Sequence, residues 1–161
     1  MDKLLSNPTF EVLGFIGLAF TMNAVVYGLG WNRESRNRVY SKQEKEAMRL
    51  LPPGYVIGGV WMVLFGLFGY IHYLLYVVQH KISTACVVVE LLVLFCLLYP
   101  VLTSLQDSSL MRVLNLLSLV FGFMVGLVVI TVSVDAFWYL VPYLLWTFYV
   151  CYVGTYGSQP P

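Results

Sequence analysis

The side chains that could support acid–base or metal chemistry are few in this sequence. Its two histidines, His72 and His80, do not lie near a nucleophile–base pattern, and no HExxH, GxSxG or phosphate-binding glycine loop is present. The cysteines Cys86, Cys96 and Cys151 lie in apolar runs without a CxxC pair. This indicates small core residues rather than metal ligands or a disulfide framework. We therefore expect no enzyme of the general acid–base type, no metal site and no cofactor.

One carboxyl group stands inside an otherwise apolar run. Glu90 lies about a third of the way along the third such run of the chain. A carboxyl within a membrane-spanning helix is costly and is by default a functional candidate. Two interpretations follow. Glu90 binds a ligand or a proton, or it is a protonated or interface-reaching carboxyl that pairs with another helix.

Aromatic residues provide a second kind of chemistry, the binding of flat apolar ligands. Residues 52–61 read Pro-Pro-Gly-Tyr-Val-Ile-Gly-Gly-Val-Trp. From there, Trp61, Phe65, Phe68 and His72 fall at i, i+4, i+7 and i+11, which is one face of a helix. This face is either an aromatic packing surface between helices or one wall of a ligand cavity. Spacing alone favours packing.

A second aromatic face is expected near the C-terminus. Residues 142–146 read Pro-Tyr-Leu-Leu-Trp, and Tyr143, Trp146 and Tyr149 follow one another at intervals of three. Residues three apart share a helix face. Pro142 frees a backbone carbonyl that neighbouring helices must satisfy.

The elements that position these residues are predicted to be membrane helices. The chain is 60% hydrophobic and 11% charged, against about 25% charged residues in soluble domains. Each apolar run has about the 20 residues that a helix needs to cross about 30 Å of hydrocarbon. The runs span about 12–31, 54–78, 82–105, 110–134 and 136–156. We predict an all-α integral membrane protein in which residues 1–161 form a single five-transmembrane-helix bundle.

The basic residues predict the orientation of this bundle in the membrane. Five spans place the first loop (32–51), the third loop and the C-terminus on one side, which holds seven of the nine Lys and Arg residues. The other side holds Lys3 and Lys81. The positive-inside rule then places the first loop in the cytosol. A net charge of +1 provides no basic face for nucleic acid.

Gly122 and Gly126 form a small-xxx-small pair in the fourth run. Such pairs allow helices to approach closely. We expect this pair to pack against another helix of the same chain rather than against a second copy.

The sequence resembles a known family of membrane proteins. Five spans, a Pro-Pro-x-Tyr/Trp-Val-x-Gly-x-Val-Trp opening of the second and Pro-Tyr-Leu-x-Trp in the fifth are similar to the translocator protein family. It is also called the tryptophan-rich sensory protein or peripheral benzodiazepine receptor family. The topology matches over about residues 10–156, and the residues match best in 52–70 and 142–149.

The resemblance implies a cavity open toward the first loop. Family members bind porphyrins, haem-like tetrapyrroles, sterols and benzodiazepine-type ligands, and they commonly form homodimers. The resemblance also implies an integral, multi-pass protein of the mitochondrial outer membrane or another endomembrane. Trp61 and Trp146 occupy the positions of the family's pocket tryptophans, and Tyr55 that of the aromatic residue after the proline pair. The predicted ligand-binding residues are Tyr55, Trp61, Phe65, Glu90, Tyr143, Trp146 and Tyr149.

The chain also departs from the family pattern. Gly59 stands where the family usually has proline, and Leu92 and Cys96 stand where it has glutamine and asparagine. Gly154 replaces an asparagine near the end of the fifth span. Polar groups that would orient a ligand are therefore missing at these positions.

Three functions remain open on the sequence. The first is a translocator-type protein that binds, and transports, a hydrophobic planar ligand. The second is a membrane regulatory or interaction protein with a vestigial cavity, which the lost polar residues favour. The third is an enzyme that modifies tetrapyrroles, for which the chain has no dedicated catalytic group. The expected partners are the lipid bilayer, a porphyrin, haem-like or sterol ligand, and a second copy of the chain.

Overall fold

Five α-helices account for nearly all of the described residues, 7–28, 49–103 and 108–156, of the computed structural model. They are α2 (Pro8–Gly28), α4 (Gly54–Gln79), α5 (Thr84–Thr103), α6 (Ser108–Ile130) and α7 (Val134–Tyr156). All five are long and apolar enough to cross a membrane. The prediction of an all-α, five-transmembrane-helix protein is confirmed.

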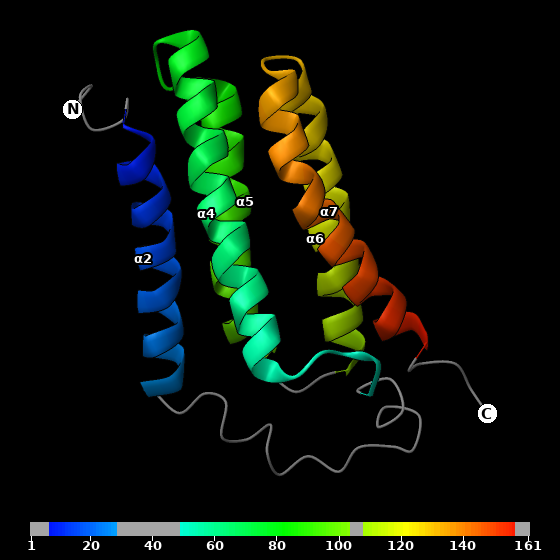
Figure 1. Ribbon diagram of the computed structural model, residues 1–161. Helices are drawn as coiled ribbons and strands as arrows, with labels where there is room; N and C mark the ends of the chain where they lie inside the picture. The colour runs from blue at the N-terminus through cyan, green and yellow to red at the C-terminus, as the bar shows by residue number, and fades with distance from the viewer. Residues whose placement is uncertain (1–6, 29–48, 104–107, 157–161) are drawn as a thin grey trace.

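The helices form a bundle with α2 at one edge (Figure 1). Helix α2 packs on α4 and α5. In addition, α4 contacts α7, and α5 contacts α6. The last two helices, α6 and α7, pack closely along each other. The Pro8 end of α2 and the Tyr156 end of α7 lie at opposite ends of the bundle (Figure 1).

The first helix begins at Pro8, four residues before the predicted start at residue 12. The backbone N–H of Thr9 donates to Asn7 Oδ1 over 3.0 Å, so Asn7 caps the helix. Proline suits the first helical position because its missing N–H would have no helical partner there. This earlier start brings Glu11 inside the helix. The predicted end of the span and most of the loop 32–51 lie outside the described residues.

Ser83 and Ser133 cap the N-termini of α5 and α7. The N–H of Cys86 donates to Ser83 Oγ over 3.4 Å before α5, and the N–H of Ala136 donates to Ser133 Oγ over 3.2 Å before α7. Helix α6 ends at Ile130 rather than at the predicted residue 134. The chain turns there, and Ser133 already caps α7. Residues 104–105, the predicted end of the third span, lie outside the described ranges.

The bundle has an apolar interior and an apolar exterior. Its largest fully buried side chains include Phe68, Ile71, Leu75, Val89, Leu92, Val125, Val129, Leu140 and Tyr143. Large apolar side chains on the outer faces of all five helices are exposed as well. An apolar surface of this extent is typical of a protein surrounded by lipid, since soluble monomers expose only small apolar patches.

Glycines mark the closest helix contacts. A Cβ atom on Gly69 would lie 2.6 Å from the backbone oxygen of Glu11, so α2 lies directly on the backbone of α4. A Cβ on Gly122 would lie 2.6 Å from the Tyr143 ring, and one on Gly126 would lie 3.2 Å from the ring of Phe137. The glycine pair of α6 therefore packs on α7 within the chain, as predicted.

Candidate ligand-binding site

The predicted aromatic face of α4 divides into two parts. The rings of Trp61 and Phe65 lie 6.0 Å apart between centroids, and those of Phe65 and Phe68 lie 5.9 Å apart. Phe68 is fully buried and packs edge-on against Tyr143 at 5.2 Å. Trp61 and Phe65 instead line a cavity. The middle of this face therefore packs between helices, and its Gly54 end forms one wall of the cavity.

A cavity of about 570 Å³ opens between α2, α4 and α5. Its volume falls within the range of about 300–1,000 Å³ that is typical of small-molecule sites. Small residues on facing helices leave the space, because Ala19, Ala24, Gly54 and Gly58 carry little or no side chain. The other lining residues are Phe20, Asn23, Ile57, Trp61, Met62, Phe65, Cys96, Leu97, Tyr99 and Pro100. We call this space the α2–α4–α5 cavity.

A second, smaller pocket of about 150 Å³ lies between α4, α5, α6 and α7. Trp61 and Trp146 both line it. The remaining lining residues are Leu51, Ile57, Cys96, Tyr99, Asn115, Ser118, Thr147 and Val150. We call it the central pocket. Because Trp61, Cys96 and Tyr99 line both spaces, the α2–α4–α5 cavity and the central pocket share a wall.

Polar groups gather around the central pocket. The hydroxyl of Tyr99 donates to Asn115 Oδ1, and the hydroxyls of Ser118 and Tyr143 are hydrogen-bonded over 2.7 Å. The indole Nε1 of Trp146 is buried and has no hydrogen-bond partner among the described residues. A buried donor without an acceptor is uncommon in proteins. The indole N–H would gain an acceptor only from a group that the described residues do not supply.

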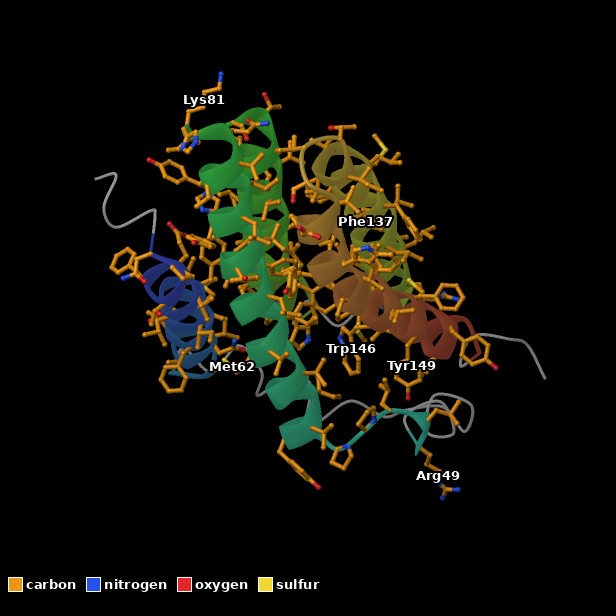
Figure 2. All side chains as sticks on the ribbon, turned by 45° about the horizontal axis from the view of Figure 1, so that its top comes forward. Arg49, Met62, Lys81, Phe137, Trp146 and Tyr149 are labelled. Carbon is orange, nitrogen blue, oxygen red and sulfur yellow. The ribbon has the colours of Figure 1, made fainter. Side chains whose placement is uncertain are left out.

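The other predicted site residues lie outside the two spaces. Tyr143 is buried in the core, and Tyr55, at 81% exposed, lies on the surface at the start of α4. Tyr149 donates a hydrogen bond to the backbone carbonyl of Leu50. Trp146 and Tyr149 project from α7 toward the segment that holds Arg49 (Figure 2). Glu90 contacts His72 and lines neither space. Of the seven predicted residues, Trp61, Phe65 and Trp146 line the cavity or the pocket.

The prediction missed the polar residues of both spaces. Asn23 lines the α2–α4–α5 cavity, whereas Asn115 and Ser118 line the central pocket. The sequence held a signal for the last two, because polar residues three apart in an apolar run share one helix face. Polar groups of the central pocket therefore come from Asn115 and Ser118 on α6 as well as from Tyr99 on α5 and Thr147 on α7.

The fold and the site define a class of protein. A bundle of five membrane-crossing helices with an aromatic, largely apolar cavity defines a multi-pass integral membrane protein. The chain belongs to the TspO/MBR family, whose family model matches residues 14–156. This confirms the resemblance seen in the sequence. The searches of curated proteins and of solved structures found no match.

Proposed function

We propose that this member of the TspO/MBR family binds, and carries through the membrane, a hydrophobic planar ligand of the tetrapyrrole, sterol or benzodiazepine type. The observation that carries the proposal is the α2–α4–α5 cavity, about 570 Å³ in volume and walled on one side by Trp61 and Phe65. Apolar pockets with a few placed polar groups are the usual form of small-molecule sites.

The chemistry of the lining supports a flat, mostly apolar ligand. Aromatic rings stack on planar molecules and bury large areas, and stacking contributes about 0.5–1.5 kcal/mol beyond the buried area. The polar atoms at hand are few: the amide of Asn23, the hydroxyl of Tyr99 and the buried indole N–H of Trp146. A ligand with one or two acceptor groups, such as carboxylates or a carbonyl, would suit them.

The lining favours binding over catalysis. Its ionisable side chains are Cys96 and Tyr99, and both are neutral at ordinary pH. The described acidic residues of the helices are Glu11, Glu90 and Asp135, and they do not line either space. We therefore propose a carrier or receptor rather than an enzyme, and we extend the family resemblance to a homodimer in the mitochondrial outer membrane or another endomembrane.

A second candidate is a regulatory or interaction protein with a vestigial cavity. The small volume of the central pocket, about 150 Å³, favours it. So does the hydrogen bond between Tyr99 and Asn115, because it already satisfies two of the polar groups that could orient a ligand. In this case the α2–α4–α5 cavity would hold lipid chains and no specific ligand.

A matched pair of glycine variants separates the two candidates. Gly58 lines the α2–α4–α5 cavity, whereas Gly59 lines an open groove between α4 and α7 on the outside of the bundle. A Cβ at either position meets no atom within 4 Å, so both glycines accept a side chain. Gly58→Leu should fill the cavity, and Gly59→Leu should add the same atoms outside it.

The experiment is titration of the purified protein in lipid nanodiscs with protoporphyrin, followed by quenching of tryptophan fluorescence. We expect saturable binding that Gly58→Leu weakens at least tenfold and Gly59→Leu leaves unchanged, about 1.4 kcal/mol of difference. Equal affinities for both variants would place the ligand outside the cavity. Quenching that does not saturate in any form of the protein would support the regulatory candidate.

A further inference from the structure

Three helices of the bundle each contain a single Asp, Glu, His, Lys or Arg residue. They are Glu11 in α2, His72 in α4 and Glu90 in α5. These three residues meet in space. His72 Nδ1 lies 3.2 Å from Glu11 Oε2, and His72 Nε2 lies 3.1 Å from Glu90 Oε1. The imidazole therefore stands between two carboxylates that come from different helices.

Packing places this triad within the bundle. Glu11 is 5% exposed and His72 is 3% exposed, whereas Glu90 is 49% exposed. The backbone of α2 lies against Gly69, three residues before His72, which brings Glu11 to the imidazole. The ring of Phe15 covers the imidazole at 5.8 Å between centroids. His72 is seven residues, about 10 Å, from the Lys81 end of α4, so the triad lies inside the span.

The charge of the triad depends on how many protons it holds. An imidazolium between two carboxylates carries a single net negative charge, and one further proton makes the group neutral. A net charge inside a membrane span is costly, so the bilayer favours the neutral form. Glu11 Oε1 is buried and has no hydrogen-bond partner among the described residues, which makes it the oxygen least stabilised as an anion.

Other groups near the triad do not supply the missing positive charge. Glu11 interacts electrostatically with His72 and Glu90. The remaining ionisable side chains nearby are phenols and a thiol, which do not carry a positive charge: Tyr70, Tyr73 and Tyr76 on α4, Cys86 on α5 and Tyr139 on α7. Asp135 is exposed at the start of α7. A metal ion does not fit, because the ring separates the carboxylates and no described group of three ligands could hold one.

We propose that Glu11, His72 and Glu90 form a proton-binding site inside the membrane, with Glu90 as its outer and Glu11 as its inner carboxylate. The half-exposed carboxylate of Glu90 takes up a proton. The ring starts as the imidazolium and releases its Nδ1 proton to Glu11, which leaves two protonated carboxyl groups, a neutral imidazole and no net charge. This site is distinct from both ligand spaces and does not depend on the proposed ligand.

Infrared difference spectroscopy tests the site directly. The protein in lipid nanodiscs is titrated with acid, and the carbonyl stretch of protonated carboxyl groups is followed. We expect a band from an apolar environment to appear on acidification, to be lost in Glu11→Gln and to be altered in Glu90→Gln. Asp135→Asn, which removes an exposed carboxyl group outside the triad, should keep the band. A band that survives in both Glu11→Gln and Glu90→Gln would overturn the proposal.

Nuclear magnetic resonance of ¹⁵N-histidine gives a second test that works on the unmodified protein. The chain has two histidines, and His80→Asn assigns their signals; asparagine tolerates the left-handed backbone of that position, where φ is 53°. Coupled groups titrate as a unit. The His72 signal should therefore change over the same pH interval as the infrared band. A His72 signal that stays constant across that interval would overturn the proposal even if a glutamine variant failed to fold.

Discussion

The contact between α2 and α4 predicts a large effect from one added methyl group. In Gly69→Ala the new Cβ would lie 2.6 Å from the backbone oxygen of Glu11 and 2.9 Å from the Cα of Val12. Carbon atoms in contact prefer about 3.5–4.0 Å, so α2 would have to move by about 1 Å. Both neighbours are backbone atoms, and rotation of a side chain therefore cannot relieve the clash.

Two opposing terms set the magnitude. Alanine stabilises a helix interior over glycine by about 1 kcal/mol. Overpacking of a close contact costs about 1–3 kcal/mol. We expect Gly69→Ala to lower the free energy of unfolding by about 1–2 kcal/mol, because displacement of α2 also separates Glu11 from His72.

Equilibrium unfolding in mixed micelles, followed by circular dichroism, measures this change. Two controls come from the same helix. A Cβ on Gly66 would lie 3.3 Å from the terminal methyl of Ile16, which can rotate away, so Gly66→Ala should be nearly neutral. Gly58→Ala meets no atom within 4 Å and should stabilise slightly. If Gly69→Ala were as stable as Gly66→Ala, the close packing of α2 on α4 would be refuted.

Three further predictions concern orientation and internal contacts. Arg49 and Lys81 are exposed at opposite ends of the bundle (Figure 2). Single cysteines at these positions should react with an impermeant thiol reagent from opposite faces of the membrane, with Arg49→Cys labelled from the cytosol. Labelling of both from one face would contradict the topology. Ser118→Ala should lower the free energy of unfolding by about 0.5–1.5 kcal/mol in the same assay. The loss is small because the Tyr143 hydroxyl still donates to the backbone carbonyl of residue 118 over 3.2 Å. A loss above about 3 kcal/mol would show that this second hydrogen bond does not compensate. Tyr149→Phe should speed hydrogen exchange in the segment before α4, because the hydroxyl holds a backbone carbonyl of that segment; unchanged exchange would show that the bond does not restrain it.

The sequence was sufficient to predict the five helices and the internal glycine contact. Apolar runs of about 20 residues have few alternatives to a membrane helix. The four-residue spacing of Gly122 and Gly126 indicates a close helix contact, which the structure has. The start of α2 was missed because hydropathy alone placed it directly after the charged residue Glu11. The capping side chain of Asn7 and the proline after it move the start to Pro8.

The site could be predicted only where residues of one helix define it. The periodicity of α4 placed Trp61 and Phe65 on one face, and both line the α2–α4–α5 cavity. Periodicity does not tell which neighbour covers each turn, so it could not separate these residues from buried Phe68 or from His72. The meeting of His72 with Glu11 and Glu90 depends on how three separate helices pack together, and a single sequence contains no local signal for it.

We propose that Trp61 and Trp146, which line two spaces that share a wall, hold a planar ligand. Trp61 lines both spaces and Trp146 lines the central pocket, whereas Trp138 is 64% exposed on the outer surface of α7. The most direct test measures the dissociation constant of protoporphyrin for Trp61→Ala, Trp146→Ala and Trp138→Ala, with the helical fold checked by circular dichroism. We predict that each of the first two variants binds about thirtyfold more weakly, or about 2 kcal/mol, and that Trp138→Ala binds as the unmodified protein does. Equal and small effects from all three substitutions would contradict the account, because Trp61 and Trp146 would then serve only to pack the helices.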